Sequence, residues 1–320
     1  MVEELPAYAP SGEGNHLFVH VEKRLRTTEE VAISLARAAG TRPADVGYAG
    51  RKDRVGVTRQ WFSLEGWTPA DALAVEIPDV RILAAARHPH KLRTGHLRGN
   101  RFEITVRDVS RAAAGLAAER LEGMVERGMP NRYGPQRYGR EGMNVQRGAA
   151  ILRGEARLRD KRSGRFLISA VQSAVFDRVL GERPLALDAV EPGDIARVEE
   201  SGGLFLVEDA LVEGERSARF EISATGPIFG TRVIAPAGAV AEREAAAHLA
   251  LGLPAPDEIR PPPGVRLRGA RRPLRVRPAG AGLEIRDDCV VVRFELPSGS
   301  YATVLLAELF GELVDGGIED

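Results

Sequence analysis

Alternation of apolar and polar residues with a period of two is the feature that most restricts the fold of this chain. It occurs in residues 16–23 (HLFVHVEK), 59–66 (RQWFSLEG) and 101–109 (RFEITVRDV). Such a pattern predicts strands that bury one face and leave the other exposed. Segments with helical spacing lie between these strands, without the regular order of parallel βαβ units. The sequence therefore predicts an α+β fold.

Start and stop signals place the helices and one long loop. Thr27 and Glu30 have capping-box spacing ahead of a helix that Gly40 closes. Residues 166–182 (FLISAVQSAVFDRVLGE) predict an amphipathic helix. Residues 128–142 (GMPNRYGPQRYGREG) are too rich in Gly, Pro and Asn for a regular element. They predict a structured loop.

Changes in composition suggest that one domain interrupts another. The 320 residues are enough for about two domains. The composition shifts near Glu155 and again near Arg275, and residues 182–221 between them hold eleven acids against four Arg. We expect the first domain to comprise residues 1–154 and 276–320, and the inserted domain to comprise residues 155–275.

Basic residues are clustered although the formal net charge is zero, with 45 basic and 45 acidic side chains. Residues 87–101 hold five Lys or Arg and no acid, and residues 260–277 hold seven Arg and no acid. Residues 132–165 hold ten Lys or Arg against three acids. If these runs share a face, that face attracts a polyanion such as a nucleic acid. If they lie on different faces, they are ordinary solvated surface.

Several functional classes lack their sequence signals. The single cysteine, Cys289, excludes an intramolecular disulfide and a cysteine-based zinc site. The histidines do not match a zinc-ligand pattern, and neither a P-loop nor a dinucleotide fingerprint occurs. The chain lacks an apolar run of membrane-spanning length and a secretory signal. We therefore expect a cytoplasmic protein without metal, cofactor or membrane contact.

The first candidate site is the turn Gly50–Arg54 (GRKDR), in which Asp53 lies among Arg51, Lys52 and Arg54. Neighbouring cations favour the ionised carboxylate, which suits a nucleophile or an electrostatic stabiliser. The pair Lys52–Asp53 is also what an ordinary surface ion pair looks like, and such pairs contribute about 0–1 kcal/mol. The residues alone leave both interpretations open.

Two further segments could contact a nucleotide. Residues 131–139 (NRYGPQRYG) combine stacking tyrosines, an asparagine with a donor and an acceptor for a base edge, and Arg137 for a phosphate. Residues 296–309 (LPSGSYATVLLAEL) place Tyr301 where a helix begins. The alternative interpretations are a loop with half-buried tyrosines and simple helix capping by Ser298 or Ser300.

These segments occur in the order found in one family. Residues 50–60 (GRKDRVGVTRQ) resemble the G-x-K-D…T-x-Q motif of the tRNA pseudouridine synthase D (TruD) family. Residues 131–139 resemble its N-x-x-G-x-Q-R-[FY]-G motif, and residues 296–309 resemble its C-terminal motif. Residues 90–104 (HKLRTGHLRGNRFEI) and 165–180 also look like family segments. The resemblance covers nearly the whole chain.

The resemblance implies a fold, a reaction and a set of site residues. The fold is a pseudouridine synthase catalytic domain, with a mixed, largely antiparallel sheet and an inserted α+β domain. The reaction converts uridine 13 of tRNA to pseudouridine without a cofactor, and we expect a monomer. Asp53 would be the catalytic nucleophile. The residues expected to bind substrate are Asn131, Tyr301, Tyr133, Lys52, Gln60 and Arg137.

Three alternatives stay open. Asp53 could attack C1′ of the ribose or assist by abstracting a proton from the sugar. The chain could instead bind RNA without catalysis, or hydrolyse a nucleoside, although hydrolases of this kind usually use two carboxylates. The family also has a P-E-D-F stretch with a substrate-binding Phe just upstream of where VEELPAYAPSGEG begins here. A protein that begins at Met1 is expected to be a weak enzyme.

Overall fold

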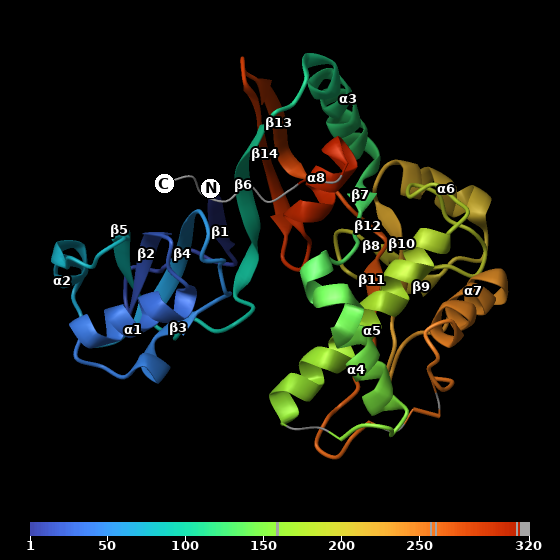
Figure 1. Cartoon of the computed structure of the whole chain (residues 1–320), viewed down its shortest axis with the longest axis horizontal. Coiled ribbons are helices and arrows are strands. Elements are labelled where there is room, and N and C mark those ends of the chain that lie inside the picture. Colours follow the sequence, from blue (N-terminus) through green and yellow to red (C-terminus); the bar gives the residue numbers. More distant parts are fainter. Residues whose placement is uncertain (158–159, 257, 260, 312, 314–320) are drawn as a thin grey trace. The chain divides into compact units, whose positions relative to one another are not determined.

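The computed structural model describes residues 1–157, 160–256, 258–259, 261–311 and 313 (Figure 1). Packing divides the chain into two compact units. Unit 1 contains residues 1–121 and 278–299, and unit 2 contains residues 122–277 and 300–311. The units interleave along the chain, but their bounds differ from the expected positions 155 and 275. The division into a catalytic and an inserted domain stays a prediction.

Unit 1 is built on an eight-stranded mixed sheet, in the order β13-β14-β6-β1-β4-β2-β5, with β3 beside β4. Only β1 and β4 are parallel among the described strand pairs, and the other pairs are antiparallel. The predicted α+β class and the mixed, largely antiparallel sheet are confirmed. The strands are β1 (Val2–Pro6), β2 (His16–Arg24), β3 (Gly47–Tyr48), β4 (Val57–Leu64), β5 (Val80–His88), β6 (Leu97–Arg107), β13 (Ala279–Ile285) and β14 (Cys289–Pro297).

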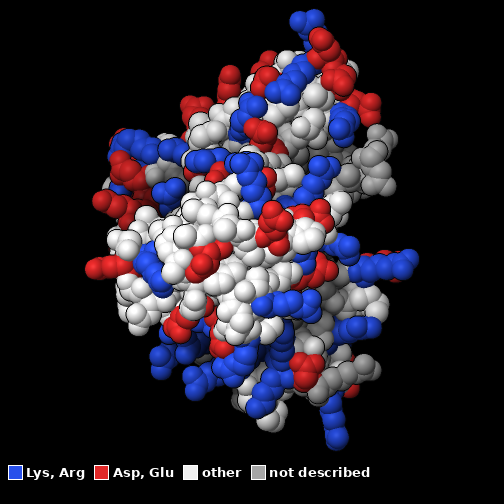
Figure 2. Space-filling model, turned by 90° about the vertical axis from the view of Figure 1, so that its left-hand side faces the viewer, with Lys and Arg blue, Asp and Glu red and all other residues white. Residues whose placement is uncertain are grey.

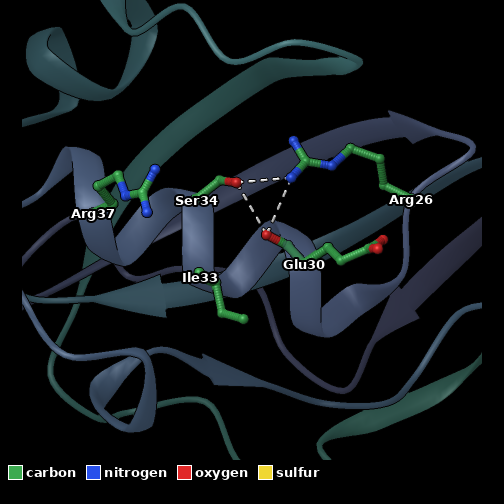
Figure 3. Close-up of a pocket in the computed structure, with 5 residues that line it drawn as sticks. All are labelled: Arg26, Glu30, Ile33, Ser34 and Arg37. Carbon is green, nitrogen blue, oxygen red and sulfur yellow. Dashed lines mark hydrogen bonds between the residues drawn. The ribbon is translucent and has the colours of Figure 1, made fainter.

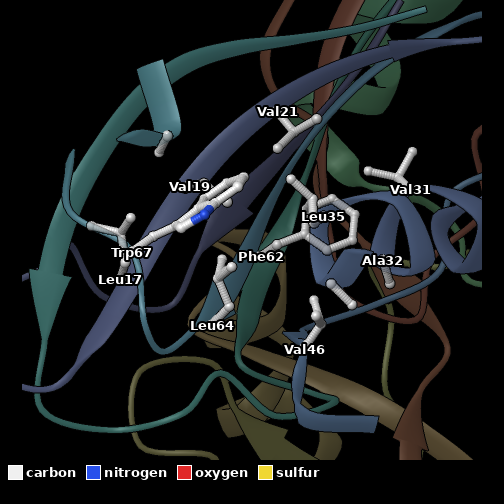
Figure 4. Packing of buried hydrophobic residues seen from close by; sticks show 12 residues of the cluster. Leu17, Val19, Val21, Val31, Ala32, Leu35, Val46, Phe62, Leu64 and Trp67 are labelled. Atoms are coloured by element: carbon white, nitrogen blue, oxygen red, sulfur yellow. The ribbon is translucent and has the colours of Figure 1, made fainter. Parts of the chain in front are cut away.

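Helices α1 (Thr28–Ala38) and α2 (Pro69–Ala74) and the short turn η1 (Pro43–Asp45) belong to unit 1. The capping box predicted at Thr27 and Glu30 is present at the start of α1. Figure 4 shows α1 packed on the sheet through a cluster of buried side chains that includes Val31, Leu35 and Phe62. β2 buries Leu17, Val19 and Val21 in this same cluster. The half-buried strand predicted from the alternation in residues 16–23 is therefore confirmed.

Unit 2 contains a four-stranded sheet in the order β11-β10-β8-β9 and a separate pair of β7 and β12. Long helix α5 packs against β10, α4 and α7. The helix α3 (Arg111–Arg127) runs from unit 1 into unit 2. The remaining elements are β7 (Met129–Pro130), η2 (Pro135–Arg137), η3 (Arg140–Gly142), α4 (Met143–Leu152), α5 (Lys161–Glu182), β8 (Ile195–Val198), β9 (Leu204–Leu206), α6 (Ala210–Ala218), β10 (Ile222–Ile228), α7 (Gly238–Leu249), β11 (Ala270–Pro273), β12 (Arg275–Val276) and α8 (Ala302–Phe310).

The loop predicted from residues 128–142 has short pieces of structure, β7, η2 and η3, joined by irregular backbone. It follows α3 and precedes α4. Helix α8 has Tyr301 in its N-cap position, as the sequence indicated. Among the described residues, none of the helices is both long and apolar enough to cross a membrane.

Candidate active site

Asp53 lies between β3 and β4 of unit 1, in a loop whose backbone is held at several points. Lys52 N–H donates to Thr28 Oγ1 at 2.9 Å, and Lys23 Nζ donates to the carbonyl oxygen of Asp53 at 2.8 Å. Arg54 Nε donates to the carbonyl of Leu25 at 3.1 Å. Asp53 is exposed, and its carboxylate has no hydrogen bond to any residue that the structure describes. The loop is therefore fixed while its carboxylate is left available.

Gln60 closes a ring of hydrogen bonds beneath this loop. Its side chain is completely buried in the core-facing side of β4. Thr28 Oγ1 donates to Gln60 Oε1 at 2.8 Å, and Gln60 Nε2 donates to the carbonyl of Gly50 at 3.2 Å. Both ends of the amide are thus occupied within the protein. This placement favours a role in holding the loop, and substrate contact by Gln60 stays a prediction.

Lys52 points into the protein rather than toward solvent. Its Nζ lies 3.2 Å from Glu4 Oε2 and donates to Asn100 Oδ1 at 2.8 Å. The side chains of Lys52 and Glu4 are only 7% and 1% exposed. Burial raises the pKa of Glu4, and the Lys52 ammonium opposes that shift. Lys52 anchors the residue next to Asp53, whereas its predicted substrate contact is untested.

Lys23 is a second buried cation near the loop. It is 1% exposed, and its Nζ also donates to the carbonyl of Arg26 at 2.5 Å. Burial lowers the pKa of Lys23, while the negative charge of Asp53 acts in the opposite direction. A charge-charge interaction therefore links Asp53 to a lysine that sequence reasoning missed. Lys23 lies in the alternating pattern of residues 16–23 at a position that the pattern assigns to the buried side.

Arg26 lines a shallow hollow of about 250 Å³ along α1, shown in Figure 3. Its guanidinium donates to Ser34 Oγ at 2.8 Å and to the carbonyl oxygens of Glu30 and Pro78. Ile33 and Arg37 complete the lining. These hydrogen bonds use the Arg26 guanidinium to tie the turn before α1 to the helix and to Pro78.

Asn131 follows β7 in unit 2 and is 4% exposed. Its Oδ1 accepts from Arg272 at 2.6 Å and from Ser300 Oγ at 3.2 Å. Its Nδ2 donates to the carbonyl of Pro273 at 2.9 Å. Two donors of the protein therefore already bind the side-chain oxygen, and substrate contact by Asn131 stays a prediction. Arg272 and Ser300 use the two lone pairs of that oxygen.

Tyr133 and Tyr301 lie together, with ring centroids 5.8 Å apart and planes tilted by 58°. Tyr133 also meets the Phe176 ring edge-on at 5.8 Å, and the Arg272 guanidinium lies 4.2 Å from the Tyr133 centroid. A Cβ on Gly134 would come within 2.7 Å of the Tyr301 ring, so glycine is needed there for the close approach. Both tyrosines are half-buried.

Asp177 on α5 holds the loop that carries Tyr133. Its carboxylate accepts from Tyr133 N–H at 3.0 and 3.2 Å and from the Tyr138 hydroxyl. Burial raises the pKa of Asp177, and the hydrogen bond from Tyr138 opposes that shift. The pKa of Tyr138 is raised by burial and by the hydrogen bond to Asp177. Sequence reasoning missed Asp177, because a single acid on an amphipathic helix gives no signal.

Arg137 lies beside the same aromatic cluster. Its guanidinium carbon is 5.6 Å from the Tyr133 ring centroid and 5.7 Å from that of Phe166. Burial raises the pKa of Tyr301, and the charge of Arg137 opposes this. Arg137 is half-buried, so its predicted phosphate contact remains a prediction.

The structure brings the second and third motifs together in unit 2, where Asn131, Tyr133 and Arg137 meet Tyr301. Asp53, Lys52 and Gln60 are brought together in unit 1. On the face shown in Figure 2, Lys and Arg are interspersed with Asp and Glu and gather at the lower edge of the view. Within the described residues, no group of three or more His, Cys, Asp and Glu is arranged to hold a metal ion.

Comparison with known proteins identifies one family. A family model described as tRNA pseudouridine synthase D (TruD) matches residues 1–159 and 160–309. Relatives named tRNA pseudouridine synthase D include that of Geobacter sp. (strain M21). The two sequences are 40% identical, and the match covers 97% of this chain and 93% of that protein. Those of Anaeromyxobacter sp. (strain Fw109-5) and Thermus thermophilus are 44% and 43% identical, over 96% of this chain and 89% and 85% of theirs.

The fold has a solved counterpart. A crystal structure described as tRNA pseudouridine synthase D (TruD) from Methanosarcina mazei superposes with a TM-score of 0.77 at 21% identity. The match covers 97% of this chain and 91% of that one. It supports the fold alone, whereas the sequence relatives confirm the resemblance drawn from the motifs.

Proposed function

Because the chain belongs to the tRNA pseudouridine synthase D (TruD) family of isomerases, we propose that it converts uridine 13 of tRNA to pseudouridine, with Asp53 as the nucleophile. The family resemblance supports the position in the tRNA. The observation that carries the assignment of Asp53 is its exposed carboxylate, free of hydrogen bonds from the described residues, on a loop fixed by Lys23, Thr28 and Gln60.

The reaction rearranges bonds within one nucleotide. The N1–C1′ bond of uridine breaks, the base turns, and C5 bonds to C1′. C5 then loses its proton and N1 gains one, so the product is an isomer of uridine. An ionised Asp53 can attack C1′ and later be displaced, or it can take a proton from the sugar. Both routes need a carboxylate that is not already paired. The fixed backbone of the loop supports this role, since a catalytic group must be held in one geometry.

Unit 2 supplies the groups suited to a flipped-out base. Removing a base from its stack costs a few kcal/mol, which stacking and edge contacts offset. Tyr133 and Tyr301 are half-buried aromatic side chains of the kind that stack on bases. Asn131 has a side-chain amide for the base edge, and Arg137 carries a positive charge for the RNA backbone. We assign substrate binding to these four residues.

Substitution of Asp53 tests the proposal. We expect Asp53→Asn and Asp53→Ala to abolish pseudouridine formation at position 13 of a tRNA transcript, while tRNA affinity stays within a few-fold of wild type. Asp45→Asn is a matched control, since Asp45 is a carboxylate in the same unit whose partner is the exposed Arg42. Retention of more than a few per cent of the wild-type rate by both Asp53 variants would refute the assignment.

Product analysis separates the remaining alternatives. An isomerase retains the base in the RNA, a hydrolase releases free uracil, and a binding module without catalysis leaves the uridine unchanged. We also propose that the protein acts as a monomer in the cytoplasm. Light scattering of the purified protein and fractionation of the source cells test these two points.

A further inference from the structure

The amide of Asn131 has only one possible orientation. The Arg272 guanidinium can only donate, so the group that faces it at 2.6 Å must be Oδ1. The carbonyl of Pro273 can only accept, so the group 2.9 Å from it must be the Nδ2 amino group. Ser300 Oγ then donates to the second lone pair of Oδ1. The surrounding groups thus settle an assignment that side-chain shape cannot settle.

Among the residues that the structure describes, one hydrogen-bonding group of Asn131 has no partner, the second N–H of Nδ2. We infer that Arg272 is a positioning residue, which occupies Oδ1 of Asn131 and leaves its side chain able only to donate a hydrogen bond to the base. Asn131 then recognises a carbonyl oxygen of uracil and not its N3–H. This rests on the proposed function and adds the kind of group on the base that Asn131 recognises. Nδ2 would face O4 or O2 of the base, because these are the acceptors of uracil.

Arg272 is itself held in place by contacts with Asn131, Tyr133 and Phe176. Its Nε donates to the carbonyl of Asn131 at 3.1 Å while a terminal nitrogen binds Oδ1, so the guanidinium grips one residue at two atoms. The guanidinium carbon of Arg272 lies 4.2 Å from the ring centroid of Tyr133 and 5.4 Å from that of Phe176. Only a planar, forked donor can make both bonds and stack on a ring, which a lysine ammonium cannot do.

A donor-only asparagine has a consequence for specificity. Cytosine carries an amino donor where uracil has O4, so a fixed N–H facing that position meets another donor. Such an element discriminates against the wrong base as well as favouring the right one. If Nδ2 faces O2 instead, cytosine and uracil look alike to Asn131, and discrimination lies elsewhere. Thiocarbonyl analogues distinguish the two positions, because sulfur is the weaker acceptor.

The experiment uses the full chain and tRNAs with uridine, 4-thiouridine or 2-thiouridine at position 13. Single-turnover rates and tRNA affinities are measured separately. Wild type should act on one thio analogue roughly 2- to 13-fold more slowly than on uridine, the range for one lost hydrogen bond. In Arg272→Gln and Asn131→Ala, the ratio of the rate on uridine to the rate on that thio analogue should be close to one. Arg277→Gln is the control, since it removes an exposed arginine from the same run and leaves Asn131 untouched.

Arg272→Lys keeps the inference testable if Arg272→Gln does not fold. The lysine retains the charge near the rings, so its melting temperature should stay close to wild type while the analogue ratio still approaches one. Equal rates on all three tRNAs by wild type, or an unchanged ratio in a folded Arg272 variant, would overturn the inference. Absence of any pseudouridine from wild type on the uridine tRNA would instead refute the proposed function.

Discussion

Lys52→Met should destabilise unit 1 through the carboxylate it leaves behind. In the wild type the Lys52 ammonium lies 3.2 Å from the buried Glu4 carboxylate. Methionine fills a similar volume without charge. Among the described residues, Glu4 then retains one hydrogen bond, which the backbone N–H of Trp61 donates to Oε1 at 3.3 Å. An unpaired buried charge is strongly unfavourable, so Glu4 will take up a proton rather than stay ionised.

Protonation sets the upper limit of the loss. The ordinary pKa of a glutamate is 4.5, and holding the carboxyl neutral at pH 7 costs about 3.4 kcal/mol at 1.36 kcal/mol per pH unit. The pKa of Glu4 is already raised in the wild type, so part of this cost is present there. We expect Lys52→Met to lower the free energy of unfolding by about 2–3 kcal/mol at pH 7, equivalent to roughly 4–12 °C.

The pH dependence has a definite sign. A carboxyl with a raised folded pKa contributes most to stability below its unfolded pKa, and that contribution is lost as the pH rises through the folded pKa. The difference between wild type and Lys52→Met should therefore be small near pH 4.5 and grow toward pH 7. Urea unfolding at several pH values measures it, and Glu4→Gln in the Lys52→Met background should restore most of the stability.

A loss of the same size at pH 5 and pH 7.5, or a loss below about 0.5 kcal/mol at pH 7, would refute this reasoning, because either result means that Glu4 does not depend on Lys52. Arg51→Met is the matched control. Arg51 is the neighbouring cation, and its partner Glu29 is 41% exposed, so its replacement should change little.

Further predictions concern the supports of the site and one buried histidine. Gln60→Leu leaves Thr28 Oγ1 and the Gly50 carbonyl without their partner, and calorimetry should show a loss of about 1–3 kcal/mol with a reduced isomerisation rate. Tyr301→Ala should weaken tRNA binding or slow the reaction by roughly 5- to 150-fold if this ring stacks on the base, and a smaller effect than twofold in both would exclude it. His248 is 2% exposed, and burial lowers its pKa from the ordinary 6.5, so the stability it confers is present above about pH 6.5 and lost as the pH falls. Denaturant titrations of His248→Gln and wild type should therefore converge between about pH 7.5 and pH 5, and curves that stay parallel would contradict this assignment.

Local pattern was sufficient for the elements that the sequence predicted. The capping box at Thr27 and Glu30 formed because its partners are three residues apart, within one turn. The strand at residues 16–23 formed with its apolar positions buried, because side-chain direction in a strand depends only on the count along the chain. Tyr301 is at the start of α8 for the same kind of local reason.

The sequence by itself determined these elements, the family, and the residue types that bear on the reaction. Only the tertiary structure decided which hydrogen-bond donors and acceptors of each polar side chain remain available to a substrate. Arg272 and Asn131 are 141 positions apart, yet their contact removes the acceptor that Asn131 was expected to present. Lys52 and Gln60 belong to the Asp53 motif, yet contacts to Glu4, Asn100 and Thr28 turn both inward. A motif specifies donors and acceptors, but only packing between distant segments shows which of them are already used, since most buried polar groups in a folded protein are hydrogen-bonded.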